Sequence, residues 1–122
     1  MWEDEFFLAV HSSFWAKQQR RWGLPGGGIE RREAPEYAVR RELEEELELQ
    51  VSTLTEVGAF HYKGRDHMVF GARIDTRIDS YDETELLDIG WYTLNQVRNL
   101  SATNQLHAGY ELRAIESFLE KI

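Results

Sequence analysis

The sequence predicts an α/β fold, and three observations support that prediction. Residues 5–10 form a short apolar and aromatic run, which is typical of a buried strand. Residues 35–47 place Val39, Leu43 and Leu47 four positions apart, which is the spacing of the core-facing side of a helix. Residues 56–62 and 67–74 are strand-like runs separated by a short polar segment, as in a β-hairpin.

The other elements follow along the chain. We expect a short strand at residues 29–30, and a helix from Pro35, which suits the first helical position. The hairpin loop should be residues 63–66, and residues 75–81 should form a loop before a strand at 86–92. A helical turn at 94–100 and a linker precede a helix from about residue 105 to the end. Its buried stripe should hold Leu112, Ile115, Leu119 and Ile122.

Composition limits the class of protein. The 122 residues, 42% of them hydrophobic, fit one globular domain over residues 1–122. There is no cysteine, which excludes disulfides and thiolate metal sites and is compatible with the cytoplasm. The longest apolar run, residues 6–10, is too short for a membrane span, and we expect neither a signal peptide nor membrane binding. A net charge of −8 disfavours a large nucleic acid but permits a small phosphorylated ligand beside a bound cation.

Five glutamates lie between positions 42 and 48. On a helix, carboxylates three or four positions apart repel each other at a cost of about 0.2–0.5 kcal/mol per pair. At about 100° per residue, Glu42, Glu45 and Glu46 share one arc. The others, Glu44 and Glu48, should point away with Arg41. Oxygen-only ligands of this kind suit Mg²⁺, Mn²⁺ or Ca²⁺, and Mg²⁺ usually adds substrate phosphates to one or two carboxylates.

The alternative interpretation is a solvated acidic helix, in which Arg40–Glu44 and Arg41–Glu45 pairs soften the repulsion. The pattern of residues over a longer stretch of the chain favours the metal site. Five residues separate Gly27 from Glu33, and seven more precede the run Arg41-Glu42-Leu43-x-Glu45-Glu46. In this pattern, and in the Leu24-Pro25 before it, the chain resembles the Nudix hydrolases.

Two positions depart from the family pattern. Glu48 and Arg32 stand where the family usually has glycine. Neither replaces an expected ligand. Glu48 does remove the residue best suited to a left-handed helix cap, which puts the stability of this helix end and the following turn in doubt.

The resemblance implies an α/β/α sandwich, with a central mixed sheet between the glutamate-rich helix and the C-terminal helix. Residues 5–10 correspond to the family's second strand, and the usual first strand has hardly any room. Its absence would leave a sheet edge that another chain could cover, so we hypothesise a homodimer.

The resemblance also implies roles for particular residues. The metal ligands would be Glu42, Glu45, Glu46 and the Gly26 carbonyl, holding Mg²⁺ or Mn²⁺. Gly27 and Glu33 would be structural, with Glu33 paired to Arg41. The catalytic residues would be Glu45, Arg41 and Glu85. Glu83 is the second choice for the loop acid, and Glu85 is equally well explained as a solvated loop residue. The identity of the general base stays open.

Five residues are candidates for contacts with substrate: Arg20, Trp15, Tyr62, Lys63 and Arg65. Surface solvation is the alternative for the charged ones, and core packing is the alternative for Trp15. The four histidines are scattered and show no metal-ligand spacing.

The reaction implied is hydrolysis of a pyrophosphate bond in a nucleoside diphosphate linked to another group. Nucleotide sugars, ADP-ribose, dinucleoside polyphosphates and nucleoside triphosphates all fit. A regulatory module that binds nucleotides without turnover is the second hypothesis, and the intact glutamate set favours the enzyme. A Nudix-related isomerase is disfavoured because such enzymes use a cysteine.

Overall fold

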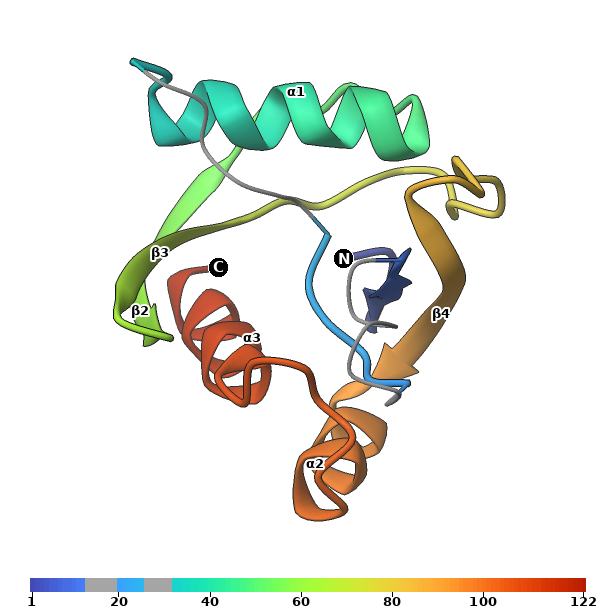
Figure 1. Ribbon diagram of the computed structural model, residues 1–122, viewed down its shortest axis with the longest axis vertical. Coiled ribbons are helices and arrows are strands. Elements are labelled where there is room, and N and C mark those ends of the chain that lie inside the picture. Colours follow the sequence, from blue (N-terminus) through green and yellow to red (C-terminus); the bar gives the residue numbers. More distant parts are fainter. Residues whose placement is uncertain (13–19, 26–31) are drawn as a thin grey trace.

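The computed structural model describes residues 1–12, 20–25 and 32–122 and arranges them as a layered α/β domain (Figure 1). The strands are β1 (Glu5–His11), β2 (Thr55–Tyr62), β3 (Arg65–Gly71) and β4 (Leu86–Thr93). The helices are α1 (Pro35–Leu47), α2 (Leu94–Ala102) and α3 (Glu111–Lys121). Within these ranges no helix is long and apolar enough to cross a membrane.

β1 is the central strand of the core, and it is buried on both faces. Phe6 and Leu8 pack in the hydrophobic cluster that includes α3, whereas Phe7 and Ala9 pack in the cluster that includes α1. Successive side chains of a strand point to opposite faces, so a strand between two helical layers must be apolar throughout. Figure 1 shows α1 on one side of the strands and α2 and α3 on the other, which is the predicted sandwich.

The described strands form two antiparallel pairs, β1–β4 and β2–β3. In the first pair Glu5 lies opposite Thr93, and the register shifts between Val10 and His11. Parallel pairing in the described residues is limited to one bridge, between Trp22 and Leu106. A single mixed sheet is therefore not formed by these strands, and the strand predicted at residues 29–30 lies outside the described residues.

The β2–β3 hairpin is tighter than predicted. Its loop is Lys63-Gly64, with Tyr62 opposite Arg65, so the expected four-residue loop is wrong. Both loop residues have positive φ, 50° and 76°, as in the two-residue turns whose twist matches that of paired strands. β3 then ends at Gly71, where a Cβ atom would lie 2.1 Å from the Phe118 ring of α3. Glycine allows this close approach of helix to strand.

The C-terminal helix begins at Glu111, not at residue 105. Residues 105–107 are not helical, because they form a bridge with Trp22, in which Trp22 N–H donates to the Gln105 carbonyl at 2.9 Å and His107 N–H donates to the Trp22 carbonyl at 2.8 Å. The buried face of α3 also differs from the predicted one. Ala114, Ile115 and Phe118 are buried together with Glu111, and of the predicted stripe only Ile115 is fully buried. Leu112 and Leu119 are partly buried, and Ile122 is 48% exposed.

α1 has the predicted bounds but is bracketed by two unusual residues. Arg32, three residues before it, has φ 64°, and Glu48, directly after it, has φ 51°. These are the two positions where a glycine was expected by resemblance. Glu48 N–H still donates to the Glu44 carbonyl at 2.9 Å, so the helix ends in left-handed geometry without a glycine.

Candidate active site

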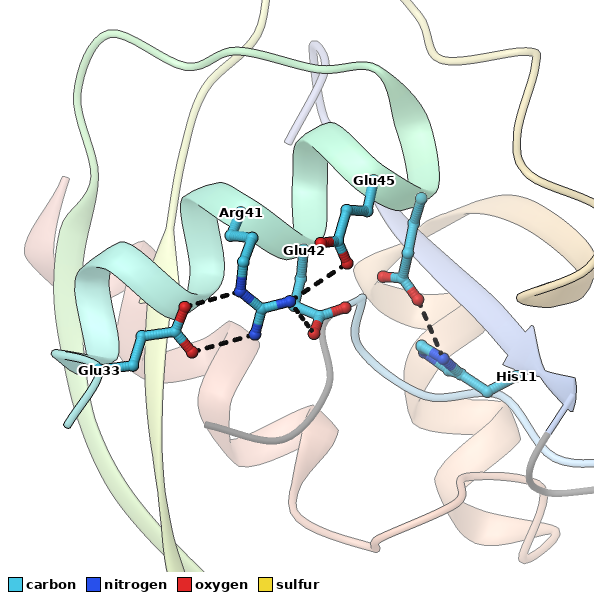
Figure 2. Close-up of polar contacts among 6 residues, drawn as sticks. His11, Glu33, Arg41, Glu42 and Glu45 are labelled. Carbon is cyan, nitrogen blue, oxygen red and sulfur yellow. Dashed lines mark hydrogen bonds and ion pairs between the residues drawn. The ribbon is translucent and has the colours of Figure 1, made fainter. Parts of the chain in front are cut away.

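Arg41 lies at the centre of a polar network on α1 (Figure 2). Its Nε donates to Glu33 Oε2 at 2.6 Å, and its Nη2 donates to Glu33 Oε1 at 3.0 Å. This two-point pairing of planar groups is among the stronger ion pairs in proteins. The Arg41 and Glu33 side chains are only 18% and 5% exposed. The predicted ion pair is therefore present, and the prediction that Arg41 points away is wrong because this pairing turns it inward.

The same guanidinium also contacts two of the clustered carboxylates. Arg41 Nη1 donates to Glu42 Oε1 at 3.0 Å and to Glu45 Oε2 at 3.1 Å. The three carboxylates differ in exposure: the side chains of Glu42, Glu45 and Glu46 are 14%, 55% and 2% exposed. Burial raises the pKa of Glu42; the charge of Arg41 opposes this, and the charges of Glu46 and Glu45 add to it. Burial, the largest of these effects, therefore keeps the pKa of Glu42 raised although Arg41 lies beside it.

His11, at the end of β1, is a site residue that the sequence did not reveal (Figure 2). Its Nδ1 lies 3.3 Å from Glu46 Oε2, and its Nε2 lies 3.1 Å from the Leu24 carbonyl oxygen. Burial lowers the pKa of His11, but the hydrogen bond and charge of Glu46, together with the Leu24 contact, outweigh burial and leave the pKa raised. His11 thus ties β1 and the segment at 20–25 to α1. A polar residue at the end of a run that is otherwise apolar was the available signal.

The loop before β4 lies against this end of α1. Asp82 N–H donates to the Glu46 carbonyl at 2.8 Å, and Ser12 N–H donates to the Glu85 carbonyl at 2.9 Å. These bonds bring Glu85 to the same side of the molecule as the clustered carboxylates. Glu85 itself is exposed in the turn directly before β4. The loop that carries Glu85 therefore lies against the end of α1, and the catalytic role of Glu85 stays a prediction.

A cavity of about 670 Å³ joins many of these residues. Glu42, Glu46 and Glu85 line it, and so do Tyr62 and Arg65 of the hairpin. Lys63 is exposed at the hairpin turn, next to Tyr62. Arg20 lies elsewhere, on the surface, where it pairs with Asp88. Trp15, Gly26 and Gly27 fall outside the described residues.

The donor atoms suit a hard divalent cation. Glu42 and Glu46 both line the cavity, and Mg²⁺ commonly takes one or two carboxylates and completes its shell with phosphates and water. In residues 1–12, 20–25 and 32–122 no three acidic or histidine side chains converge closely enough to hold a metal among them. The described residues thus offer such a cation the carboxylates of Glu42 and Glu46 on the cavity wall.

Three comparisons relate the chain to known proteins. The model of the NUDIX domain matches residues 2–112. A Mycobacterium tuberculosis protein named "Putative 8-oxo-dGTP diphosphatase 3" is 29% identical over 111 residues, which are 84% of this chain and 49% of that protein. The chain thus spans about half the length of the curated relatives it matches.

Solved structures share the fold. The NUDIX domain of Shewanella oneidensis NrtR, solved with ADP-ribose, superposes with a TM-score of 0.72 at 21% identity, over 96% of this chain and 77% of that chain. A C. elegans Ap4A hydrolase superposes with a TM-score of 0.70 at 21% identity, over 97% and 89% of the two chains.

Proposed function

The chain belongs to the Nudix family, and from that premise we propose that it is a metal-dependent pyrophosphohydrolase. Its substrate is a nucleoside diphosphate linked to another group: a nucleotide sugar, ADP-ribose, a dinucleoside polyphosphate or a nucleoside triphosphate. One observation carries the proposal. The buried Glu33–Arg41 pair holds Glu42 and Glu45 in place, while Glu46 lies beside them on the wall of the same cavity.

The family resemblance suggests the roles of the residues. Glu42, Glu45 and Glu46 would hold Mg²⁺ or Mn²⁺, with the Gly26 carbonyl as a further ligand. When bound, the cation neutralises charge on phosphate oxygens and lowers the pKa of the attacking water. Arg41 orients Glu42 and Glu45, and Glu33 holds Arg41 through two hydrogen bonds. His11 fixes the rotamer of Glu46 through Nδ1.

In the reaction a water oxygen attacks one phosphorus atom, a new P–O bond forms, and the bridging P–O bond breaks. The water gives its proton to a carboxylate of the site, for which Glu45 and the exposed Glu85 are the candidates. The leaving phosphate carries away the electron pair of the broken bond. Arg65, which lines the cavity, and Lys63 beside it are placed to attract the anionic part of the substrate.

The test is hydrolysis by the wild-type protein and Glu45→Gln, assayed side by side with Mg²⁺ or Mn²⁺. The panel includes 8-oxo-dGTP and ADP-ribose, which the relatives' names mention, along with nucleotide sugars and Ap4A. Glu44→Gln is the matched control, because Glu44 is exposed on the same helix and, within the described part of the chain, its side chain forms no hydrogen bond or ion pair with the network. We expect Glu45→Gln to lose at least about a hundredfold in kcat, and Glu44→Gln to stay within about twofold of wild type.

Turnover that is equal in wild type and Glu45→Gln would contradict this assignment of the site. Nucleotide binding by the wild-type protein with no turnover of any compound would make the regulatory module the better account. The homodimer and the cytoplasmic location stay predictions; sedimentation equilibrium of the purified protein would test the first.

A further inference from the structure

His11 joins three segments of the chain through the two nitrogens of one ring. Nδ1 lies 3.3 Å from Glu46 Oε2 on α1, and Nε2 lies 3.1 Å from the Leu24 carbonyl oxygen. The His11 and Glu46 side chains are only 10% and 2% exposed, so little water competes for their contact. A carbonyl oxygen can only accept a hydrogen bond, so Nε2 donates to it, and the ring is held with Nδ1 toward the carboxylate (Figure 2).

The backbone around His11 is fixed on both sides. Two residues earlier, Ala9 exchanges two backbone hydrogen bonds with Gly23, at 2.9 and 2.8 Å. One residue later, Ser12 N–H donates to the Glu85 carbonyl at 2.9 Å. The register of β1 with β4 shifts directly before His11, and such irregularities of strand pairing often re-aim a side chain beside a functional site. The imidazole therefore meets the α1 carboxylate from a fixed position.

Each of the three clustered carboxylates has one oxygen engaged by a nitrogen atom. Arg41 Nη1 donates to Glu42 Oε1 and to Glu45 Oε2. For Glu46 the engaged oxygen is Oε2, and the nitrogen is Nδ1 of His11. An oxygen that is already hydrogen-bonded is the poorer metal ligand of the two, so these contacts favour coordination through the other oxygen. His11 thus does for Glu46 what Arg41 does for the other two carboxylates, although it lies on β1, outside the motif.

The number of oxygens that a carboxylate offers distinguishes the divalent cations. Mg²⁺ demands near-octahedral geometry with ligands at about 2.0–2.1 Å and keeps several waters. Ca²⁺ takes about 6–8 oxygens at about 2.3–2.6 Å, and it accepts both oxygens of a carboxylate. Mn²⁺ shares the preference of Mg²⁺ for octahedral oxygen sites. A carboxylate that is held to one oxygen therefore suits Mg²⁺ or Mn²⁺, whereas a carboxylate that can rotate and offer both oxygens suits Ca²⁺.

We propose that His11 is a positioning residue for cation selectivity: by engaging Oε2 of Glu46 it holds this carboxylate to coordination through Oε1, and so favours Mg²⁺ and Mn²⁺ over Ca²⁺. This inference rests on the proposed function, in which Glu46 is a metal ligand. It adds a residue that lies outside the glutamate-rich helix. His11 acts through Glu46 and touches neither the cation nor the substrate.

Two substitutions separate the two contacts of His11. In His11→Asn the amide nitrogen is attached to Cγ, as Nδ1 is, so it can still donate to Glu46. In His11→Gln the amide nitrogen is attached to the atom after Cγ, as Nε2 is, so it keeps the contact with Leu24 and loses the one with Glu46. His61→Gln is the control, because His61 pairs with Asp66 on the hairpin surface, where its side chain is 68% exposed.

Cation binding in the absence of substrate gives the readout. Mn²⁺ is added to the metal-free protein, its free concentration is followed by electron paramagnetic resonance, and Mg²⁺ or Ca²⁺ then displaces the bound Mn²⁺. The quantity compared is the ratio of the Ca²⁺ and Mg²⁺ affinities, because general damage to the site lowers both affinities together.

We expect His11→Gln to shift this ratio toward Ca²⁺ by about tenfold, since losing a group that orients a metal ligand changes metal affinity by about 10–100-fold. His11→Asn and His61→Gln should keep the ratio within about twofold of wild type. Equal ratios in wild type and His11→Gln would overturn the proposal. Equal shifts in His11→Asn and His11→Gln would also overturn it, because they would show a general structural role.

A second measurement uses only the wild-type protein. In a crystal structure with Mn²⁺, located by its anomalous scattering, Glu46 should bind the cation through Oε1 while Oε2 keeps its contact with His11. Coordination of Mn²⁺ by both oxygens of Glu46 would overturn the proposal. Turnover with a cation ratio that is indifferent to His11 would remove this inference alone, whereas a ratio that depends on His11 in a protein without turnover would remove the proposed function alone.

Discussion

Helices α1 and α2 are held in opposite ways. α2 begins with a complete capping box, in which Gln96 N–H donates to Thr93 Oγ1 at 3.3 Å and Thr93 N–H donates to Gln96 Oε1 at 2.8 Å. α1 begins after Ala34, which offers no side-chain cap, and ends at Glu48 in left-handed geometry. The helix that carries the clustered carboxylates thus has the weaker local signals. Its position depends on side chains that reach beyond the helix, above all Arg41.

Removal of Arg41 should give the largest loss of stability, because the position of α1 depends on this side chain. Arg41→Ala leaves the Glu33 carboxylate, 5% exposed, without its guanidinium partner, and loss of one partner of a buried pair costs about 3–5 kcal/mol. The free energy of unfolding from urea denaturation measures the loss. Arg98→Ala on α2 is the control, because its pair with Glu116 is about half exposed and should contribute under about 1 kcal/mol. Equal losses in the two variants would show that α1 does not depend on Arg41.

Removing the cap of α2 and adding one to α1 should reduce the difference in local stability between the first turns of the two helices. Thr93→Ala removes the capping side chain of α2 and should cost about 1 kcal/mol of stability. Ala34→Ser places a hydroxyl at the start of α1, where the backbone already has φ −68° and ψ 143°, and should add up to about 1 kcal/mol. Thermal unfolding of both variants checks the two signs. A neutral Ala34→Ser would mean that the first turn of α1 is already stabilised by other contacts.

Glycine at the two left-handed positions should stabilise α1 by a smaller amount. Arg32→Gly and Glu48→Gly each relieve a conformation that is costly for an L-residue, and the higher unfolded-state entropy of glycine offsets part of the gain. We expect about 0.5–1 kcal/mol for each variant, with near-additive effects because the sites flank a helix of thirteen residues. Glu44→Gly, in the interior of α1, should instead destabilise by about 1 kcal/mol. The same unfolding assay would show the reversal of sign.

The smallest expected effect is the pH dependence that Glu42 of α1 gives to the free energy of unfolding. The pKa of Glu42 is raised in the folded protein, so this group contributes stability that is fully present below its unfolded pKa and is lost as pH rises through the folded value. Glu42→Gln lacks that dependence. In EDTA the stability of the variant relative to wild type should therefore increase as pH rises from about 4 to 7. A constant difference across this range would contradict the direction of the shift.

Much of the fold could be predicted because its signals are local. The apolar run of β1, the spacing of Val39, Leu43 and Leu47, and the hairpin signal all reflect periodicity within a few residues. The start of α3 could not be predicted, since it depends on Trp22, more than eighty residues earlier, whose hydrogen bonds keep residues 105–107 out of the helix. The contacts of the candidate site also divide into local ones, which could be predicted, and long-range ones, which could not. The Glu33–Arg41 pair lies within a motif, whereas the contact of His11 with Glu46 joins segments that only the tertiary structure brings together.

β1 also has a consequence for the order of events during synthesis. Its partner is β4, and Ala9 pairs with Ile89, eighty positions later. At a translation rate of about 5–20 residues per second, the nascent apolar strand waits about 4–16 s before its partner exists. Until then Phe6, Phe7 and Leu8 lack the β4 ladder, and Phe6 and Leu8 also lack the cover of α3, so they are accessible to chaperones and to other nascent chains. Completion of this domain is therefore a late, long-range event in folding.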